Sequence, residues 1–161
     1  MRARKSFTLI ELIIAMAIIS MVLAAVFMAF SIALRLFVDE LARSSTYMEA
    51  DRGMSRITKD LKSAREIVSG TSREVYFWLS DLNGNGTREA DETVLFSWSG
   101  SPESSLIRTI SGETLPVAYG VRGLTITYDN PSSPKLITIK LTIGHDTNIA
   151  TLESSVRLRN L

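Results

Sequence analysis

The hydrophobic pattern divides the chain into an apolar N-terminal run and a mixed remainder. No charged residue occurs from Leu12 to Leu34, and neither Gly nor Pro interrupts this stretch. A helix crosses the hydrocarbon core of a bilayer with about 20 consecutive apolar residues. The pattern therefore predicts one membrane-spanning helical segment over residues 7–34.

After Arg35 the pattern becomes that of a helix with one buried face. Apolar residues recur at spacings of three and four, in the order Met54, Ile57, Leu61, Ala64 and Val68. Charged residues fill most of the positions between them, as on the solvent face of an amphipathic helix. We expect the helix to continue without a break to about Val68, with Gly70 as its stop.

Beyond Gly70 apolar and polar positions alternate, which is typical of strands with one buried face. The alternation predicts strands over residues 74–80, 93–99, 106–110, 124–128, 135–143 and 150–159. We expect the first two to form a hairpin that places its apolar residues on one face through the cross-strand pairs Leu79–Val94, Phe77–Phe96 and Val75–Trp98.

The predicted fold class is α+β, with a long N-terminal helix packed on an antiparallel β-sheet. The chain then has four parts. They are a basic leader (residues 1–6), a transmembrane helix segment (7–34), an amphipathic helix that continues into the globular domain (35–69) and an antiparallel β-sheet domain (70–161).

Composition excludes several classes of function. The 161 residues include no cysteine and one histidine, and the net charge is +1. Disulfides, thiolate catalysis, Cys-ligated metal sites and sites that need two histidines are therefore excluded. The near-zero charge argues against nucleic acid as a direct partner. We expect a protein that is not an enzyme and has no catalytic residues.

The N-terminal residues set the expected orientation in the membrane. Arg2, Arg4 and Lys5 precede the apolar run, so the leader is expected to stay in the cytoplasm. A secretory signal would end after an apolar region of about 7–15 residues, whereas this run continues past residues 15–17. A plain anchor fits the length but gives no role to Glu11, an ionisable group inside the run.

The residues Ser6-Phe7-Thr8-Leu9-Ile10-Glu11 resemble the N-terminal motif of type IV pilins and type II secretion pseudopilins. The resemblance implies that a prepilin peptidase cuts between Ser6 and Phe7 and methylates the new Phe7 amine. It also implies that Glu11 neutralises the terminal amine of a neighbouring subunit and sets the assembly register. The alternative for Glu11 is a carboxylate that reaches the headgroups. The family favours Gly where this chain has Ser6, so we expect slower processing.

The remainder of the chain is more weakly similar to minor pseudopilins of the J class, in residues 54–64, 106–108, 121–128 and 156–160. This resemblance implies a subunit of a pseudopilus in the bacterial inner membrane, with its globular domain in the periplasm. Its expected partners are other pseudopilins, through the N-terminal helices, and the inner-membrane assembly platform. A minor pilin of a type IV pilus or a DNA-uptake system is the alternative. The absence of the disulfide typical of major pilins favours a pseudopilin.

The loop between the first two predicted strands matches a calcium-binding pattern. Residues 81–92 fit D-x-[DN]-x-[DN]-G-x5-E, with Gly86 at the sharp turn and Glu89 able to act directly or through water. The expected Ca²⁺ ligands are Asp81, Asn83, Asn85, the Thr87 carbonyl and Glu92. An ordinary turn is the alternative, because Asn, Asp and Gly are common turn residues. A single-span, anchored, calcium-dependent binding module is thus a further candidate function.

Overall fold

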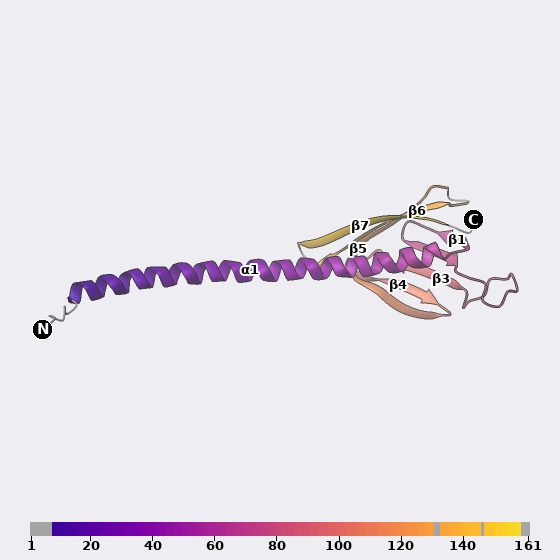
Figure 1. Ribbon diagram of the computed structural model, residues 1–161. Helices are drawn as coiled ribbons and strands as arrows, with labels where there is room; N and C mark the ends of the chain where they lie inside the picture. The colour runs from indigo at the N-terminus through magenta and orange to yellow at the C-terminus, as the bar shows by residue number, and fades with distance from the viewer. Residues whose placement is uncertain (1–7, 131–132, 146, 159–161) are drawn as a thin grey trace. The chain divides into compact units, whose positions relative to one another are not determined.

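A computed structural model describes residues 8–130, 133–145 and 147–158. It contains one helix, α1 (Leu9–Lys62), followed by strands. These are β1 (Glu66–Gly70), β2 (Glu74–Trp78), β3 (Thr93–Trp98), β4 (Ser104–Ile110), β5 (Glu113–Tyr128), β6 (Leu136–His145) and β7 (Asn148–Arg157) (Figure 1). The α+β fold class is confirmed.

The chain forms two compact units, residues Met1–Leu41 and Ala42–Leu161. The first contains the apolar part of α1, which is long enough and apolar enough to cross a membrane. Its described large apolar side chains, from Leu9 to Leu41, are all at least 49% exposed. Since such a surface is unfavourable in water, these side chains require lipid or other helices around them.

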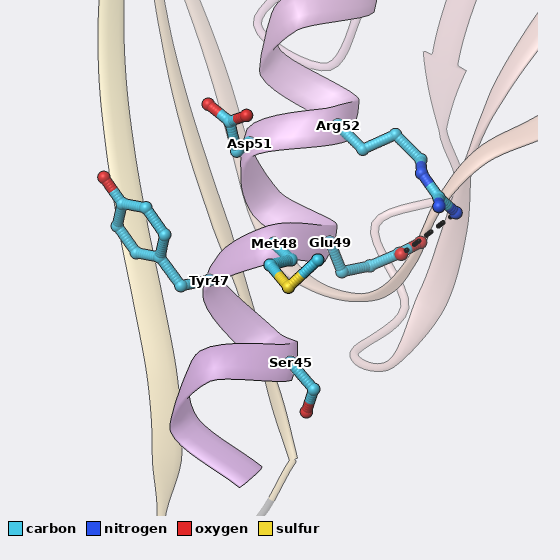
Figure 2. Close-up of a pocket in the computed structure, with 6 residues that line it drawn as sticks. All are labelled: Ser45, Tyr47, Met48, Glu49, Asp51 and Arg52. Carbon is cyan, nitrogen blue, oxygen red and sulfur yellow. Dashed lines mark ion pairs between the residues drawn. The ribbon is translucent and has the colours of Figure 1, made fainter. Parts of the chain in front are cut away.

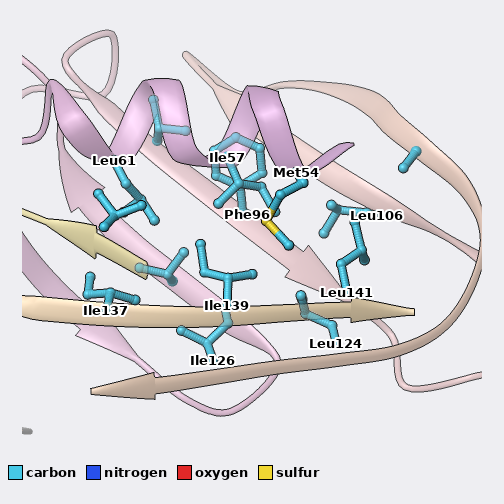
Figure 3. Close-up of a cluster of buried hydrophobic side chains, with 14 of the residues drawn as sticks. Met54, Ile57, Leu61, Phe96, Leu106, Leu124, Ile126, Ile137, Ile139 and Leu141 are labelled. Carbon is cyan, nitrogen blue, oxygen red and sulfur yellow. The ribbon is translucent and has the colours of Figure 1, made fainter. Parts of the chain in front are cut away.

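The second unit consists of the remainder of α1 and the sheet, and it holds the core (Figure 3). Met54, Ile57 and Leu61 lie on one face of α1 and are buried against the sheet. On the sheet side, the rings of Phe77 and Phe96 stack with centroids 6.1 Å apart. The helical stripe predicted from the sequence is therefore confirmed up to Leu61.

The end of the helix differs from the prediction. α1 ends at Lys62, and the expected helical segment up to Val68 instead contains β1. Ile67 pairs with Phe77 of β2, and the Arg65 N–H donates to the Trp78 carbonyl at 2.8 Å. Pairing with β2 thus satisfies backbone groups that a longer helix would have bonded internally, and it suits the β-branched side chains of Ile67 and Val68.

The strands form one seven-stranded antiparallel sheet in sequence order. The sheet is curled, and the curl brings β5 close to the start of β2 although two strands lie between them in the sheet. At this point the Ile126 N–H of β5 donates to the Ser72 carbonyl at 2.9 Å. β5 is much longer than predicted: the pattern over residues 113–123 is interrupted by Pro116, Gly120 and Gly123. Register irregularities in its pairing with β4 and β6 accommodate that interruption.

The register of the β2–β3 hairpin also differs from the prediction. Phe77 pairs with Val94 and Val75 pairs with Phe96, so the expected pairs are displaced by two residues. A two-residue shift leaves every side chain on its predicted face. Burial alone therefore does not select the register, which depends on contacts made by the connecting loop.

Candidate functional site

The N-terminal motif forms a reciprocal cap on its own helix. Both the backbone N–H and the hydroxyl of Thr8 donate to Oε2 of Glu11 at 2.9 Å. In return the Glu11 N–H lies 3.4 Å from the Thr8 hydroxyl oxygen. This is a capping box, which satisfies amide groups that have no partner in the first turn. Glu11 therefore also starts the helix, a local role that the sequence analysis did not assign to it.

The expected cleavage and methylation positions, Ser6 and Phe7, lie outside the described residues. The register role of Glu11 concerns a second subunit and stays a prediction. In this chain the Glu11 carboxylate lies at the positive end of the helix dipole, where a negative charge is stabilised.

The loop between β2 and β3 brings both ends of the predicted calcium pattern together. The Gly86 N–H donates to Oδ2 of Asp81 at 3.0 Å, and Gly86 has a φ of 72°, as the predicted sharp turn requires. Glu92 is 1% exposed, and its Oε1 accepts a 2.6 Å hydrogen bond from the Leu82 N–H. The first residue of the pattern thus contacts the turn at its sixth position, and the last residue contacts its second position.

The middle of the loop is closed by hydrogen bonds of its own. The side-chain amides of Asn83 and Asn85 donate to the Glu89 carboxylate at 3.0 and 2.9 Å. The Oδ1 atoms of the two asparagines accept from the backbone N–H groups of Asn85 and Thr87. Among the described residues, no three acidic or histidine side chains form a group that could hold a metal ion.

One oxygen in this loop is buried without a hydrogen-bond partner among the described residues, namely Oδ1 of Asp81. The Asp81 side chain is 10% exposed, and its other oxygen lies 3.3 Å from Nη1 of Arg65. A buried carboxylate oxygen without a donor is costly unless a cation or a water completes its shell.

Arg65 and Trp78 are site residues that the sequence analysis missed. The Arg65 guanidinium lies 4.6 Å from the centroid of the Trp78 ring, in addition to its ion pair with Asp81. The indole N–H of Trp78 donates to Oε2 of Glu92 at 3.2 Å. Arg65 follows the helix and Asp81 begins a later loop, so no local sequence pattern connects them.

A pocket of about 490 Å³ lies beside α1, lined by Ser45, Tyr47, Met48, Glu49, Asp51 and Arg52 (Figure 2). Figure 2 shows Glu49 and Arg52 extending to the same side, where their charged groups are 3.5 Å apart. Glu49 also accepts a 3.0 Å hydrogen bond from the Tyr119 N–H of β5. The hydrogen bond from Tyr119 joins the helix to the sheet, whereas the pair with Arg52 lies within the helix, so Glu49 has a structural role.

Comparison with known protein families gives a match at the N-terminus. Residues 1–27 match the family model described as the prokaryotic N-terminal methylation motif. The chain matches no curated protein and no solved structure. The matched segment includes Ser6, Phe7 and Glu11 and covers the start of α1, which is the one helix of the described residues. The chain therefore carries the N-terminal methylation motif at the start of a long apolar helix that continues onto an antiparallel sheet.

Proposed function

We propose that this protein is a minor pseudopilin, a structural and assembly-priming subunit of a type II secretion pseudopilus. The observation that carries the proposal is the methylation motif over residues 1–27, at the start of a helix whose apolar side chains are exposed throughout the first unit. The J-class similarity of the sheet domain and the absence of cysteine favour this function over that of a pilin in a type IV pilus or a DNA-uptake system.

The proposed role requires packing and no catalysis. The leader stays on the cytoplasmic side of the inner membrane, where prepilin peptidase removes residues 1–6 and methylates Phe7. The apolar helices of neighbouring subunits then cover one another as they leave the lipid, which removes their exposed side chains from an aqueous environment. The sheet domain lies on the periplasmic side and presents its surface to other minor subunits.

Intact-mass measurement of membrane fractions tests the processing step. With prepilin peptidase present, the mature protein is expected to lack residues 1–6 and to carry one added methyl group on Phe7. A strain without the peptidase is the control and should retain the full chain. A mature protein that begins at Met1, or beyond Ala25, would contradict the pilin assignment and favour the single-span binding module.

The capping box permits a sharper test of the assembly role of Glu11. Glu11→Gln keeps a side-chain oxygen that accepts from the Thr8 N–H but removes the charge. Thr8→Ala removes the hydroxyl of the cap and keeps the charge. We expect Glu11→Gln to be processed but not assembled, and Thr8→Ala to be assembled. Normal filaments from Glu11→Gln would show that the charge has no role in register.

We further propose that the β2–β3 loop binds one structural Ca²⁺. The ligands would be Asp81, Asn83, Asn85, the Thr87 carbonyl and Glu92. The support is the unpartnered, buried Oδ1 of Asp81, together with a loop pattern rich in the hard oxygen donors that Ca²⁺ prefers. When bound, the ion would supply a cross-link that holds the loop to the ends of β2 and β3.

Thermal melting with and without millimolar Ca²⁺ tests this site. We expect Ca²⁺ to raise the melting temperature of the wild type but not that of Asp81→Asn, since a ligand that binds only the folded state stabilises it. Asp91→Asn is the matched control, because Asp91 lies in the same loop outside the fixed ligand positions, and it should keep the response. An unchanged wild-type melting temperature in Ca²⁺ would contradict the site.

A further inference from the structure

The two edge strands of the sheet, β1 and β7, differ in how well they are protected from pairing with a strand of another chain. β1 has five residues, and its pairing with β2 is interrupted by a register shift between Ile67 and Ser69. β7 has ten residues, contains no proline, and pairs with β6 without any register shift. Short strands and bulges are devices that keep an edge from pairing with another chain. β1 has both of them, and β7 has neither.

The backbone of β7 offers a regular row of free hydrogen-bonding groups. The Leu158 N–H donates to the Lys135 carbonyl of the neighbouring strand at 3.0 Å. In antiparallel pairing, successive residues direct their N–H and C=O groups alternately to one side and the other. The odd-numbered residues of β7 therefore direct these groups away from β6, where no other strand of the described chain pairs with them. The side chains of the same residues, Ile149, Thr151, Glu153, Ser155 and Arg157, are exposed.

We propose that β7 pairs in an antiparallel manner with β7 of a second copy of this chain, about a two-fold axis at Ser155. The chemistry of the strand selects this register. On the exposed face, Glu153 lies opposite Arg157 of the second copy, and the symmetry repeats this pair. On the covered face, Leu152, which packs against the core, lies opposite the buried Leu158 of the second copy.

The two registers with the axis moved by one hydrogen-bonded pair, to Glu153 or to Arg157, lose this complementarity. A two-fold axis at Glu153 places two carboxylates opposite each other, and an axis at Arg157 does the same with two guanidinium groups. Like charges directly opposite on neighbouring strands are destabilising, whereas opposite charges are favourable. With the axis at Ser155, residues 153, 155 and 157 form about six main-chain hydrogen bonds with the second copy, two for each hydrogen-bonded pair.

The pairing is small compared with a stable interface, for which about 1,000 Å² or more is buried. We therefore expect an exchanging dimer in dilute detergent and a more populated one where the chains are concentrated in a membrane. The pairing uses neither the N-terminal motif nor the calcium loop, so its failure and the failure of the proposed function are distinguishable.

Cysteine cross-linking of the full chain tests the register directly, because the natural sequence contains no cysteine. In Ser155→Cys, the two cysteines face each other across the axis with Cα atoms about 5.5 Å apart, a separation that suits a disulfide. Thr151→Cys is the matched control. The two positions are alike in the natural chain, since the hydroxyls of Ser155 and Thr151 each share a hydrogen bond with a threonine of β6, at 2.9 and 3.1 Å. In the proposed dimer, however, the two Thr151 positions are about 27 Å apart along the strands.

Under a mild oxidant, in detergent and in native membranes, we expect several-fold more covalent dimer from Ser155→Cys than from Thr151→Cys. Equal cross-linking of the two variants, or none, would overturn the proposal. So would a Ser155→Cys product in membranes whose partner is a different protein, since that result would assign the edge to another subunit.

Exchange of the charges at positions 153 and 157 provides a second test of the register, which does not rely on a single cysteine substitution. On the Ser155→Cys background, Glu153→Arg should reduce the dimer and the double change Glu153→Arg with Arg157→Glu should restore it. Both positions are exposed, so the melting temperature should change little. Unchanged cross-linking in Glu153→Arg, or failure of the double change to restore it, would contradict the register.

Discussion

At the scale of single residues, a buried ion pair joins the helix to the sheet. Arg108 Nε of β4 donates to Oδ2 of Asp60 at 2.7 Å, and both side chains are at least nine-tenths buried. Arg56 supports the same carboxylate from one helical turn away, at 3.5 Å. Removal of one partner leaves a buried charge without compensation, which costs more than the intact pair contributes.

We predict that Asp60→Ala destabilises the protein by about 3–5 kcal/mol, because the Arg108 guanidinium is then left unpaired in the core. The double variant Asp60→Leu with Arg108→Met removes both charges and should recover most of this loss. Urea unfolding of the two variants measures the difference. Equal stability of Asp60→Ala and the wild type would show that the pair does not link helix and sheet in the way described.

The carboxylate of Asp129 organises the connection between β5 and β6. Its Oδ1 accepts from the backbone N–H groups of Leu136, Lys135 and Asn130, at 3.1, 2.9 and 2.9 Å. The hydrogen bond from the Leu136 N–H is the main cause that lowers the pKa of Asp129; burial acts in the opposite direction, and the bonds from Lys135 and Asn130 lower the pKa further. The folded state therefore favours the ionised carboxylate.

A pH dependence follows from the lowered pKa of Asp129. Its stabilising contribution is complete above the unfolded-state pKa of about 3.9 and is lost as the pH falls through the lower folded-state pKa. We predict that the wild type melts at a higher temperature than Asp129→Asn at pH 6 and that this difference shrinks below about pH 4. Asp91→Asn, which removes a carboxylate without such backbone donors, is the control. A difference that stays constant with pH would contradict this cause.

At the scale of elements, the contact between α1 and β5 depends on a glycine. A Cβ atom at Gly53 would lie 2.8 Å from Cβ of Ala118 and 3.1 Å from a methyl group of Leu141. The helix and the sheet thus approach more closely than any larger residue permits. The sequence shows this glycine within an otherwise regular helical pattern, but its neighbours on β5 and β6 are distant in the chain.

We predict that Gly53→Ala destabilises the protein, although alanine is the better helix former by about 1 kcal/mol. Overpacking of a filled core costs about 1–3 kcal/mol, and the nearest atom is a Cβ that cannot move without its backbone. Ser55→Ala, at an exposed position of the same helix, is the control and should be nearly neutral. A stabilised Gly53→Ala would mean that the contact is looser than described.

The helix boundary and the hairpin register show where local patterns reach their limit. The spacing of Leu61, Ala64 and Val68 suits a helix, but pairing of β1 with β2 determines the conformation after Lys62. In the β2–β3 hairpin the alternation fixed the faces, and the register differs because two-residue shifts bury the same side chains. A 2.8 Å hydrogen bond from the Leu79 N–H to the Glu92 carbonyl continues the observed register at the start of the loop.

At the scale of the whole molecule, the two units differ in what stabilises each of them. Every buried apolar side chain of the described chain lies at Ala50 or beyond, so the second unit contains the core. The apolar side chains before Leu41 have no such neighbours within the described chain. The first unit therefore depends on its surroundings, whereas the second is stabilised by its own packing.

We predict that a fragment of residues 42–161 folds in water without detergent and melts in one cooperative transition. It should show the near-ultraviolet circular dichroism of a packed core, with a melting temperature close to that of the globular unit in the full chain. The full chain in detergent provides the comparison. A fragment with a far-ultraviolet but no near-ultraviolet signal would show that the apolar part of α1 contributes to the core.

The sequence by itself determined the α+β class, the apolar segment and the buried face of α1, and it contained the N-terminal motif. These features depend on residues that are close together in the chain, so the period and composition of a short segment reveal them. Tertiary structure alone decided the end of α1, the hairpin register, the partners of Asp81 and Asp60, and the uneven protection of the two sheet edges. Each of these depends on which distant residues meet in the folded chain, and several arrangements of those residues satisfy the same local pattern.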